Sequence, residues 1–189
     1  MAKKEMPQVK ILAEDNRLVS FCLKIVMKLK VQTNRKKIEI EPVPRKSAGF
    51  TWVHRKYPKL VKWHRARTTN VTFVVGIDSD KKTFGQRVDE LDIKLETENM
   101  PKRKEDEQIV LVIPKRNIET WVKYFTGPPE DRGSVDEDTD YKNEFKKPNI
   151  ETTANGFIDE FRLWKKNGTS LDTLPTLIET FKELERVMA

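Results

Sequence analysis

Three acidic residues follow apolar stretches of the chain that have the composition of buried strands. Glu14 comes directly after residues 9–13, and Asp78 and Asp80 come directly after residues 71–77. If both stretches are parallel strands, their carboxyl ends lie at one rim of the sheet, where ligands of open α/β sheets bind. Carboxylates held close together repel one another, and an oxygen-preferring cation, Mg²⁺ or Mn²⁺, relieves that repulsion. The spacing therefore predicts a metal site at this rim.

Each of these residues also has a purely structural explanation. Asp78 and Asp80 are two residues apart, so in an extended chain both side chains project to the same side. They would equally serve as turn residues, and Glu14 would equally serve as a charge that favours a helix N-terminus. The pattern alone leaves both interpretations open.

A second group of candidates follows the apolar stretch at residues 109–113. We expect Lys115 and Arg116 at the same rim, where they would neutralise charge on a phosphate under attack or would be ordinary surface charges. Glu119 would be a further metal ligand, or an early helix residue that favours the helix dipole. The sequence does not decide between these alternatives.

Residues 42–77 carry eight cations and no acidic residue, although the formal charge of the whole chain is only +7. Two histidines, His54 and His64, and the aromatic residues Trp52, Tyr57 and Trp63 lie among these cations. Such a segment suits a nucleic-acid strand, because cations meet phosphates and rings stack on bases. The alternative is a solvated helix whose aromatics face the core. The eight cations are Arg45, Lys46, Arg55, Lys56, Lys59, Lys62, Arg65 and Arg67.

Apolar periodicity predicts alternating strands and helices. Strands are expected at residues 9–13, 38–41, 71–77 and 109–113, and helices at 18–29, 57–65, 84–95, 118–125, 157–164 and 177–184. Thr83 and Gln86 fit a capping box, and Asn117 is a candidate helix cap. This order predicts an α/β fold with about four mainly parallel strands flanked by helices, followed by C-terminal helices.

The predicted α/β domain spans residues 1–127, an acidic loop without periodicity spans 128–150, and a helical extension spans 151–189. The single cysteine, Cys22, excludes an intrachain disulfide and a multi-cysteine zinc site, and its place on an apolar helix face predicts a core residue. No apolar stretch approaches the roughly 20 residues of a membrane span. We therefore expect a soluble, cytoplasmic protein without a membrane partner.

Residues 9–14 and 73–80 resemble the two sequence motifs of TOPRIM domains. Residues 113–121 further resemble a segment of small stand-alone TOPRIM-like proteins related to the OLD (overcoming lysogenization defect) nucleases. The resemblance covers about residues 8–125. It implies a compact Rossmann-like fold, in which Glu14 is the acidic residue of the first motif and Asp78 and Asp80 are the paired aspartates of the second.

The resemblance also implies a Mg²⁺-dependent nuclease. A topoisomerase needs a separate tyrosine-bearing domain, and a primase usually carries a zinc module, so these activities fit the chain less well. OLD-type nucleases commonly work with an ABC-type ATPase, several of them in anti-phage defence. The chain has no Walker-type glycine loop, so the resemblance implies a separate ATPase partner.

This chain departs from the family pattern after its glutamate. Asp15 stands where glycine is usual, and Asn16 and Arg17 stand where an aspartate is frequent. These differences count against a second metal position more than against the first. Two other functions therefore stay open: a non-catalytic nucleic-acid-binding or regulatory subunit, and a small-molecule phosphohydrolase.

Overall fold

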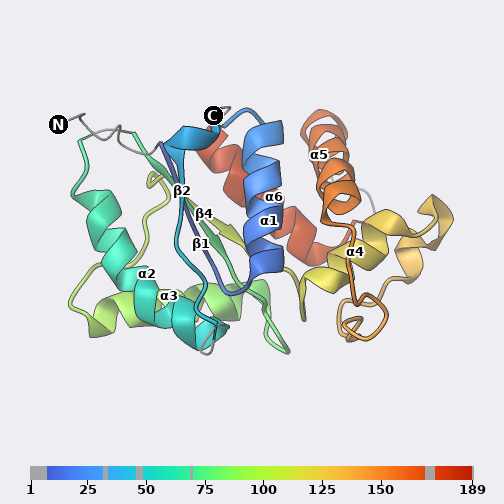
Figure 1. Cartoon of the computed structure of the whole chain (residues 1–189), viewed down its shortest axis with the longest axis horizontal. Helices are drawn as coiled ribbons and strands as arrows, with labels where there is room; N and C mark the ends of the chain where they lie inside the picture. The colour runs from blue at the N-terminus through green and yellow to red at the C-terminus, as the bar shows by residue number, and fades with distance from the viewer. Residues whose placement is uncertain (1–7, 32–33, 46–48, 69, 169–172, 189) are drawn as a thin grey trace.

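The computed structural model describes residues 8–31, 34–45, 49–68, 70–168 and 173–188. Four strands form one fully parallel sheet in the order β2-β1-β3-β4, which confirms the predicted α/β fold (Figure 1). The strands lie where apolar periodicity placed them: β1 (Val9–Ala13), β2 (Ile38–Ile40), β3 (Thr72–Gly76) and β4 (Ile109–Val112).

Helices connect and flank the strands. They are α1 (Asn16–Lys28), α2 (Phe50–Arg65), α3 (Phe84–Thr97), α4 (Ile118–Thr126), α5 (Ile150–Asn167) and α6 (Pro175–Met188), with short 3-10 helices η1 (Arg35–Lys37) and η2 (Pro129–Ser134). The capping box between Thr83 and Gln86 is present at the start of α3. Helix α2 begins at Phe50 rather than near Tyr57, because the helix continues through the buried Pro58, a residue that normally interrupts helices.

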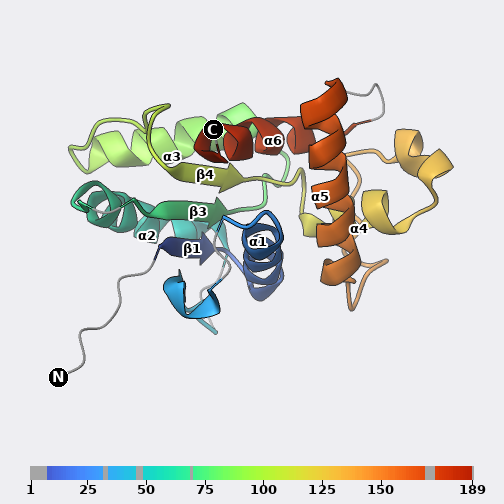
Figure 2. The same ribbon diagram turned by 90° about the horizontal axis from the view of Figure 1, so that it is seen from above.

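Successive residues of each strand point to opposite faces of the sheet and contribute to two separate apolar clusters, one on each face. Ile11 and Val74 belong to the cluster formed with α1, α4, α5 and α6, and the fully buried Cys22 lies there as expected. Leu12 and Phe73 belong to the cluster formed with α2 and α3. Figures 1 and 2 show the two helix layers on opposite sides of the sheet. The C-terminal helices thus share the core of the sheet.

The strand order explains this division of helices. The connection from β1 to β2 runs toward one edge of the sheet, whereas the connection from β2 to β3 passes back across β1. Because such crossovers are right-handed, α1 and α2 lie on opposite faces. The chain therefore diverges between the carboxyl ends of β1 and β3, which is where ligands bind in open α/β sheets.

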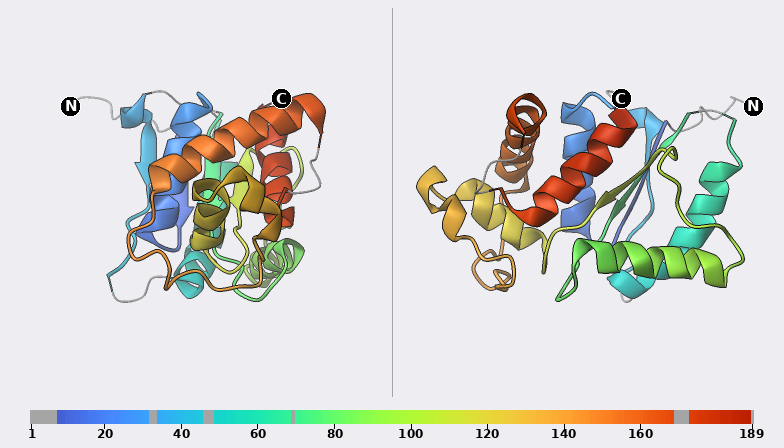
Figure 3. Two further views of the ribbon diagram at one scale, coloured as in Figure 1. Left: turned by 90° about the vertical axis from the view of Figure 1, so that its right-hand side faces the viewer. Right: turned by 180° about the vertical axis from the view of Figure 1, so that it is seen from behind.

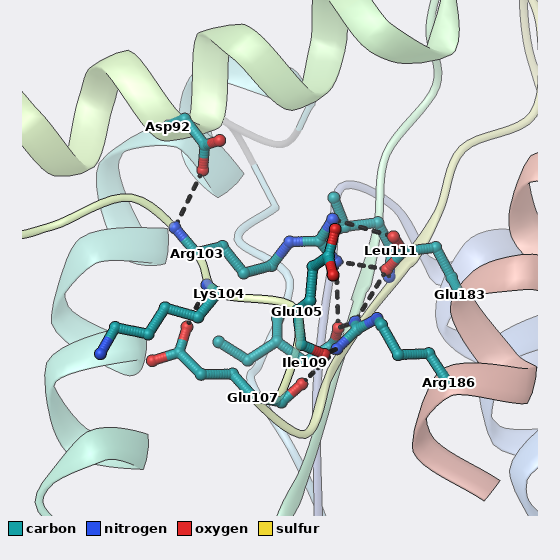
Figure 4. Close-up of polar contacts among 9 residues, drawn as sticks. All are labelled: Asp92, Arg103, Lys104, Glu105, Glu107, Ile109, Leu111, Glu183 and Arg186. Atoms are coloured by element: carbon teal, nitrogen blue, oxygen red, sulfur yellow. Dashed lines mark hydrogen bonds and ion pairs between the residues drawn. The ribbon is translucent and has the colours of Figure 1, made fainter. Parts of the chain in front are cut away.

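Strand β4 is an edge strand whose outer side is covered by α6 (Figure 3, right). The backbone N–H of Leu111 donates to Glu183 Oε2 at 3.1 Å, and the carbonyl of Ile109 accepts from both Arg103 and Arg186 (Figure 4). Arg103 and Glu183 also form an ion pair. Charged side chains thus satisfy the hydrogen-bonding groups that an exposed edge leaves unpaired.

No helix within the described ranges is both long enough and apolar enough to cross a bilayer.

Candidate functional site

Glu14 and Asp78 meet at the carboxyl ends of β1 and β3. The Glu14 N–H donates to the carbonyl of Gly76 at 3.0 Å, which extends the strand pairing by one residue. The Glu14 carboxylate then accepts the backbone N–H of Asp78 at 3.0 Å. Asp78 is only 3% exposed. The parallel register therefore brings two of the three predicted carboxylates together, where Asp78 is buried and Glu14 is half-buried.

Both carboxyl groups are held in an environment that disfavours their charged forms. Burial raises the pKa of Glu14, and the charges of Asp15 and Asp80 raise it further, although hydrogen bonding with Asp78 opposes the rise. Burial raises the pKa of Asp78 well above its usual range, and the Glu14 charge adds to this effect. Such a pair gains stability by sharing a proton or by binding a cation.

Asp80 is directed away from this pair. Its backbone is left-handed, with φ of +52°, so the chain is not extended from Asp78 to Asp80. An extended chain was the condition for both side chains to project to the same side, and that condition is not met. The Asp80 carboxylate is 61% exposed and pairs with Arg87, which also binds Glu90 at 2.8 Å and the carbonyl of Asp78 at 3.1 Å.

Glu119 lies in the first turn of α4 and is 1% exposed, but its carboxylate already has a cationic partner. Arg17, at the start of α1, forms an ion pair with it and also donates to the carbonyl of Lys146 at 3.3 Å. Arg17 thus supplies the positive charge that Glu119 would otherwise seek from a metal. Across the described ranges, no group of three His, Cys, Asp or Glu side chains lies close enough together to hold a metal ion.

Three buried oxygen atoms at the rim have no hydrogen-bond partner within the described part of the chain: Asp78 Oδ1, Ser79 Oγ and Asn117 Oδ1. They lie on two connected segments, since Ser79 N donates to the carbonyl of Pro114 at 2.9 Å and Arg116 N donates to that of Asp80 at 3.1 Å. Desolvated carboxylate and amide oxygens suit a hard divalent cation. Glu14 and Asp78 therefore fit such an ion, with Asn117 as a further oxygen donor.

Ser79 and Asn117 were not among the predicted site residues. The sequence suggested Asn117 as a helix cap, and it does stand at the N-cap position of α4, but its side chain makes no capping hydrogen bond. Its amide instead donates to Asp140 at 2.9 Å. The signal that points to both residues is their position just beyond β3 and β4, at the rim where Asp78 was already recognised.

A cavity of about 550 Å³ opens at the same rim. Its lining has five cationic and two acidic side chains, a formal excess of three positive charges. The N-termini of α1, α2, α3 and α4 also lie at this end of the sheet, and helix N-termini attract anions. The cavity is lined by Phe50, Asp80, Lys81, Lys82, Arg87, Arg116, Asn117, Asp140 and Lys142.

The segment between α4 and α5, residues 127–149, lies across this end of the molecule (Figure 3, left). Sequence patterns indicated no chemistry for it, yet its acidic residues contact the rim. Asp138 pairs with Lys115 at 3.1 Å, and Glu137 accepts from the backbone N–H of Thr176 at 3.2 Å. Lys115 is thus at the predicted rim, and Asp138 partly neutralises it.

Three cations of the predicted nucleic-acid surface form a continuous exposed stripe on α2. Arg55, Lys59 and Lys62 lie about one turn apart, and none of them forms an ion pair with another described residue. Tyr57 lies on the opposite side of α2 and is fully buried in the core. Trp52 lies beside the stripe, with the Arg55 guanidinium 5.7 Å from the centre of its ring, but it is also buried. Stacking of bases on these two rings is therefore excluded, because neither ring is open to solvent.

Other cations of the basic segment are committed to contacts within the protein. Arg65 binds Glu107 through two nitrogens and donates to the carbonyls of Pro101 and Lys102 at 2.9 Å each. Lys56 lies 3.4 Å from Glu41. These contacts join α2 to neighbouring segments, so the two cations have structural roles.

The other residues predicted to bind nucleic acid in this segment differ in their surroundings. The Arg67 guanidinium lies 4.3 Å from the centre of the Trp63 ring, and Arg45 is exposed. Lys46 lies outside the described residues. His64 Nε2 is 2.8 Å from the carbonyl of Val71, so it donates there.

His54 is half-buried beside α3, and burial lowers its pKa. The arrangement that results at the carboxyl end of the sheet is a carboxylate pair, with Asp78 buried and Glu14 half-buried, beside a cationic cavity, and a basic stripe lies on the adjoining helix.

Comparisons with protein-family models, curated protein sequences and solved structures find no match to this chain.

Proposed function

We propose that the chain is a Mg²⁺- or Mn²⁺-dependent nuclease that hydrolyses or nicks phosphodiester bonds of DNA or RNA at the Glu14–Asp78 rim. One observation carries the proposal. The buried Asp78 carboxyl group, which has an oxygen without a hydrogen-bond partner among the described residues, meets the half-buried Glu14 beside a cavity whose lining has a clear excess of positive charge. The first feature suits a divalent cation, and the second suits the phosphate group of a substrate.

Different residues would bind the cation, stabilise charge on the phosphate and bind the nucleic-acid backbone. Glu14 and Asp78 would hold the cation, which when bound supplies an activated water and neutralises charge on the phosphate. Lys115 and Arg116, at the end of β4, face the same rim and stabilise negative charge that develops on the phosphate oxygens. The α2 stripe of Arg55, Lys59 and Lys62 binds the nucleic-acid backbone without reading its sequence.

A cleavage assay tests the proposal directly. Supercoiled plasmid, single-stranded DNA and single-stranded RNA are incubated with the protein and Mg²⁺ or Mn²⁺, beside Glu14→Gln and Asp78→Asn variants. Each variant is expected to lose activity by at least about 100-fold, the usual cost of removing one group that stabilises the transition state. Asp159→Asn is the matched control, because Asp159 is 72% exposed on α5 and forms its ion pair with Arg162, far from the rim. Cleavage that survives in both rim variants would come from a contaminant.

A non-catalytic nucleic-acid-binding or regulatory subunit is the second candidate, and a specific observation favours it. Two of the predicted metal ligands, Asp80 and Glu119, are neutralised by Arg87 and Arg17 rather than left for a cation. Salt-sensitive binding of nucleic acid without cleavage in the presence of any divalent ion would support this candidate and reject the nuclease.

The separate ABC-type ATPase and the role in anti-phage defence are proposals that rest on the family resemblance. Helices α5 and α6 bury their apolar faces in the core, so a partner would dock on their outer surfaces, where Leu163 is 54% exposed. Co-purification of the chain with an ATPase encoded beside it, and its loss in Leu163→Glu, would support the partnership.

A further inference from the structure

The cavity beside the carboxylate pair already binds one anionic group, and that group belongs to this chain. Asp140 Oδ1 accepts the side-chain amide of Asn117 at 2.9 Å and the backbone N–H of Lys142 at 3.0 Å. Asp140 Oδ2 lies 3.8 Å from the Arg116 guanidinium. An amide, a backbone N–H and a guanidinium thus surround a single anion, as they do in phosphate sites.

Asp140 neutralises only part of the positive charge that lines the cavity. Asp80 pairs with Arg87, and Lys82 pairs with Glu90, so these cations are already balanced. Lys81 and Lys142 line the cavity, are exposed, and form no ion pair with any described residue. Two lysines therefore remain for a ligand that carries more negative charge than one carboxylate.

Backbone strain also marks this cavity. Asp80 and Arg116 both adopt left-handed conformations, with φ of +52° and +59°, and the N–H of Arg116 donates to the carbonyl of Asp80. Such conformations are uncommon outside glycine and concentrate at functional sites. The strained pair joins the segments after β3 and β4 and sets their side chains along the cavity wall.

The size of the cavity limits its ligand. About 550 Å³ is in the range of sites that enclose a small molecule, so it admits one nucleotide unit but not a duplex. Phe50 lies on one wall, with its ring centre 4.0 Å from the Arg87 guanidinium. It offers an apolar surface for the sugar or base, while the cations take the phosphate.

We infer that this cavity is a binding site for one phosphate-bearing nucleotide of a single nucleic-acid strand, and that Asp140 occupies the phosphate position until the strand displaces it. The inference rests on the proposed function only in taking nucleic acid as the ligand. It places the bound phosphate beside the Glu14–Asp78 pair, not on it. The segment that carries Asp140 thereby acts as an internal competitor of the substrate.

Asp131 provides a matched control for Asp140. Both aspartates lie in residues 127–149 and are exposed, but Asp131 belongs to η2 and does not line the cavity. Asp131→Asn and Asp140→Asn therefore make the same change in net charge at two different places. Only Asp140→Asn removes the internal occupant of the cavity.

The test is the affinity for a fluorescent ten-nucleotide oligothymidylate, measured by anisotropy in EDTA at 0.15 M salt, where screening acts over about 8 Å. Asp140→Asn is expected to tighten binding by about five- to tenfold, which corresponds to about 1–1.4 kcal/mol. Asp131→Asn should change it by less than about twofold, because Asp131 lies outside the cavity. Equal tightening by both variants would mean a general charge effect and would overturn the inference.

Removal of cations that line the cavity should lower the affinity for the oligonucleotide. Arg116→Gln and Lys142→Gln should each weaken binding and make the dependence of log affinity on log salt shallower by about 0.7, the contribution of one phosphate contact on a single strand. Lys182→Gln, at an exposed lysine of α6 that pairs with Glu179, is the control and should change neither quantity. Circular dichroism of every variant verifies that it is folded.

The outcomes separate this inference from the proposed nuclease. Specific tightening by Asp140→Asn without any cleavage supports the nucleotide site and rejects the nuclease. Cleavage that depends on Glu14 and Asp78, together with an Asp140→Asn variant that binds like wild type, supports the nuclease and rejects the site. An oligonucleotide that binds to none of the proteins also rejects the site.

Discussion

Replacement of Asp78 by asparagine should make the protein more stable in the absence of divalent ions, although it removes a buried group. Asp78 is 3% exposed and shares its surroundings with the Glu14 carboxylate. Asparagine has the same shape and carries no charge. Its amide can donate a hydrogen bond to Glu14, so a repulsive contact becomes an attractive one. The prediction is therefore a gain in unfolding free energy and a loss of any response to metal.

The expected size of the gain follows from the charges. Two like charges about 4 Å apart repel by about 4 kcal/mol at the effective dielectric constant of about 20 that suits protein sites. Burial and the neighbouring charge raise the pKa of each carboxyl group, which makes the doubly charged pair unfavourable. We therefore expect Asp78→Asn to add about 1–3 kcal/mol at pH 7 in EDTA. Wild type should gain about 2.7 kcal/mol from Mg²⁺ at 100 times its dissociation constant, and the variant much less.

Urea unfolding followed by circular dichroism measures both effects, with each protein compared in EDTA and in excess Mg²⁺. Asp80→Asn is the control, because Asp80 is 61% exposed and forms an ion pair with Arg87. It should lose no more than about 1 kcal/mol, because the asparagine oxygen can still accept from the buried Arg87 and Arg87 keeps its ion pair with Glu90. It should also keep the Mg²⁺ response. A loss of stability in Asp78→Asn, or equal Mg²⁺ stabilisation of wild type and Asp78→Asn, would refute the reasoning about the carboxyl pair.

Three further predictions concern the edge of the sheet, the pH dependence and the α2 stripe. Glu183→Ala leaves the N–H of Leu111 and the Arg103 guanidinium without their shared partner, so urea unfolding should show a loss of about 3–5 kcal/mol, whereas Glu183→Gln keeps the acceptor and should lose less. Equal losses in the two variants would mean that charge alone matters there. Hydrogen bonds from Lys24 and Lys28 lower the pKa of Glu151 from 4.5 to about 2, so the stability that it contributes is present above pH 4.5 and is lost as the pH falls toward 2. The melting temperature should therefore fall less steeply between pH 6 and pH 2 in Glu151→Gln than in wild type. Parallel curves for the two proteins would contradict this. Replacement of Arg55, Lys59 and Lys62 by glutamine should make the salt dependence of duplex DNA binding shallower by about 2–3, and an unchanged slope would show that the duplex does not contact α2.

Local sequence signals were sufficient for most of the fold. The apolar strands β1, β3 and β4 and the apolar stripes of the helices follow from periodicity, because a buried element needs apolar residues at its own repeat. The capping box of Thr83 and Gln86 was equally readable, since all of its contacts lie within four residues. The expected start of α2 near Tyr57 was wrong, because packing carries the helix from Phe50 through the buried Pro58.

The candidate site was only partly predictable. The meeting of Glu14 and Asp78 follows from parallel strands that end at one rim, and the sequence is enough to suggest it. The direction of Asp80 depends on a left-handed backbone, which aspartate tolerates but which its residue type does not require. The partner of Glu119 is Arg17, 102 positions away in the chain, and such pairings have no local pattern.

The sequence by itself determined the α/β class, the order of the elements and the end of the sheet at which acidic and basic residues gather. Those properties depend on periodicity and on the handedness of crossovers, which act along short stretches of chain. Only the tertiary structure decided which charges neutralise one another. The Asp140 carboxylate in the cationic cavity, and Glu183 on the edge of β4, come from segments far away in the sequence. Electrostatic partners are set by distance in space, and that distance exists only once the chain has folded.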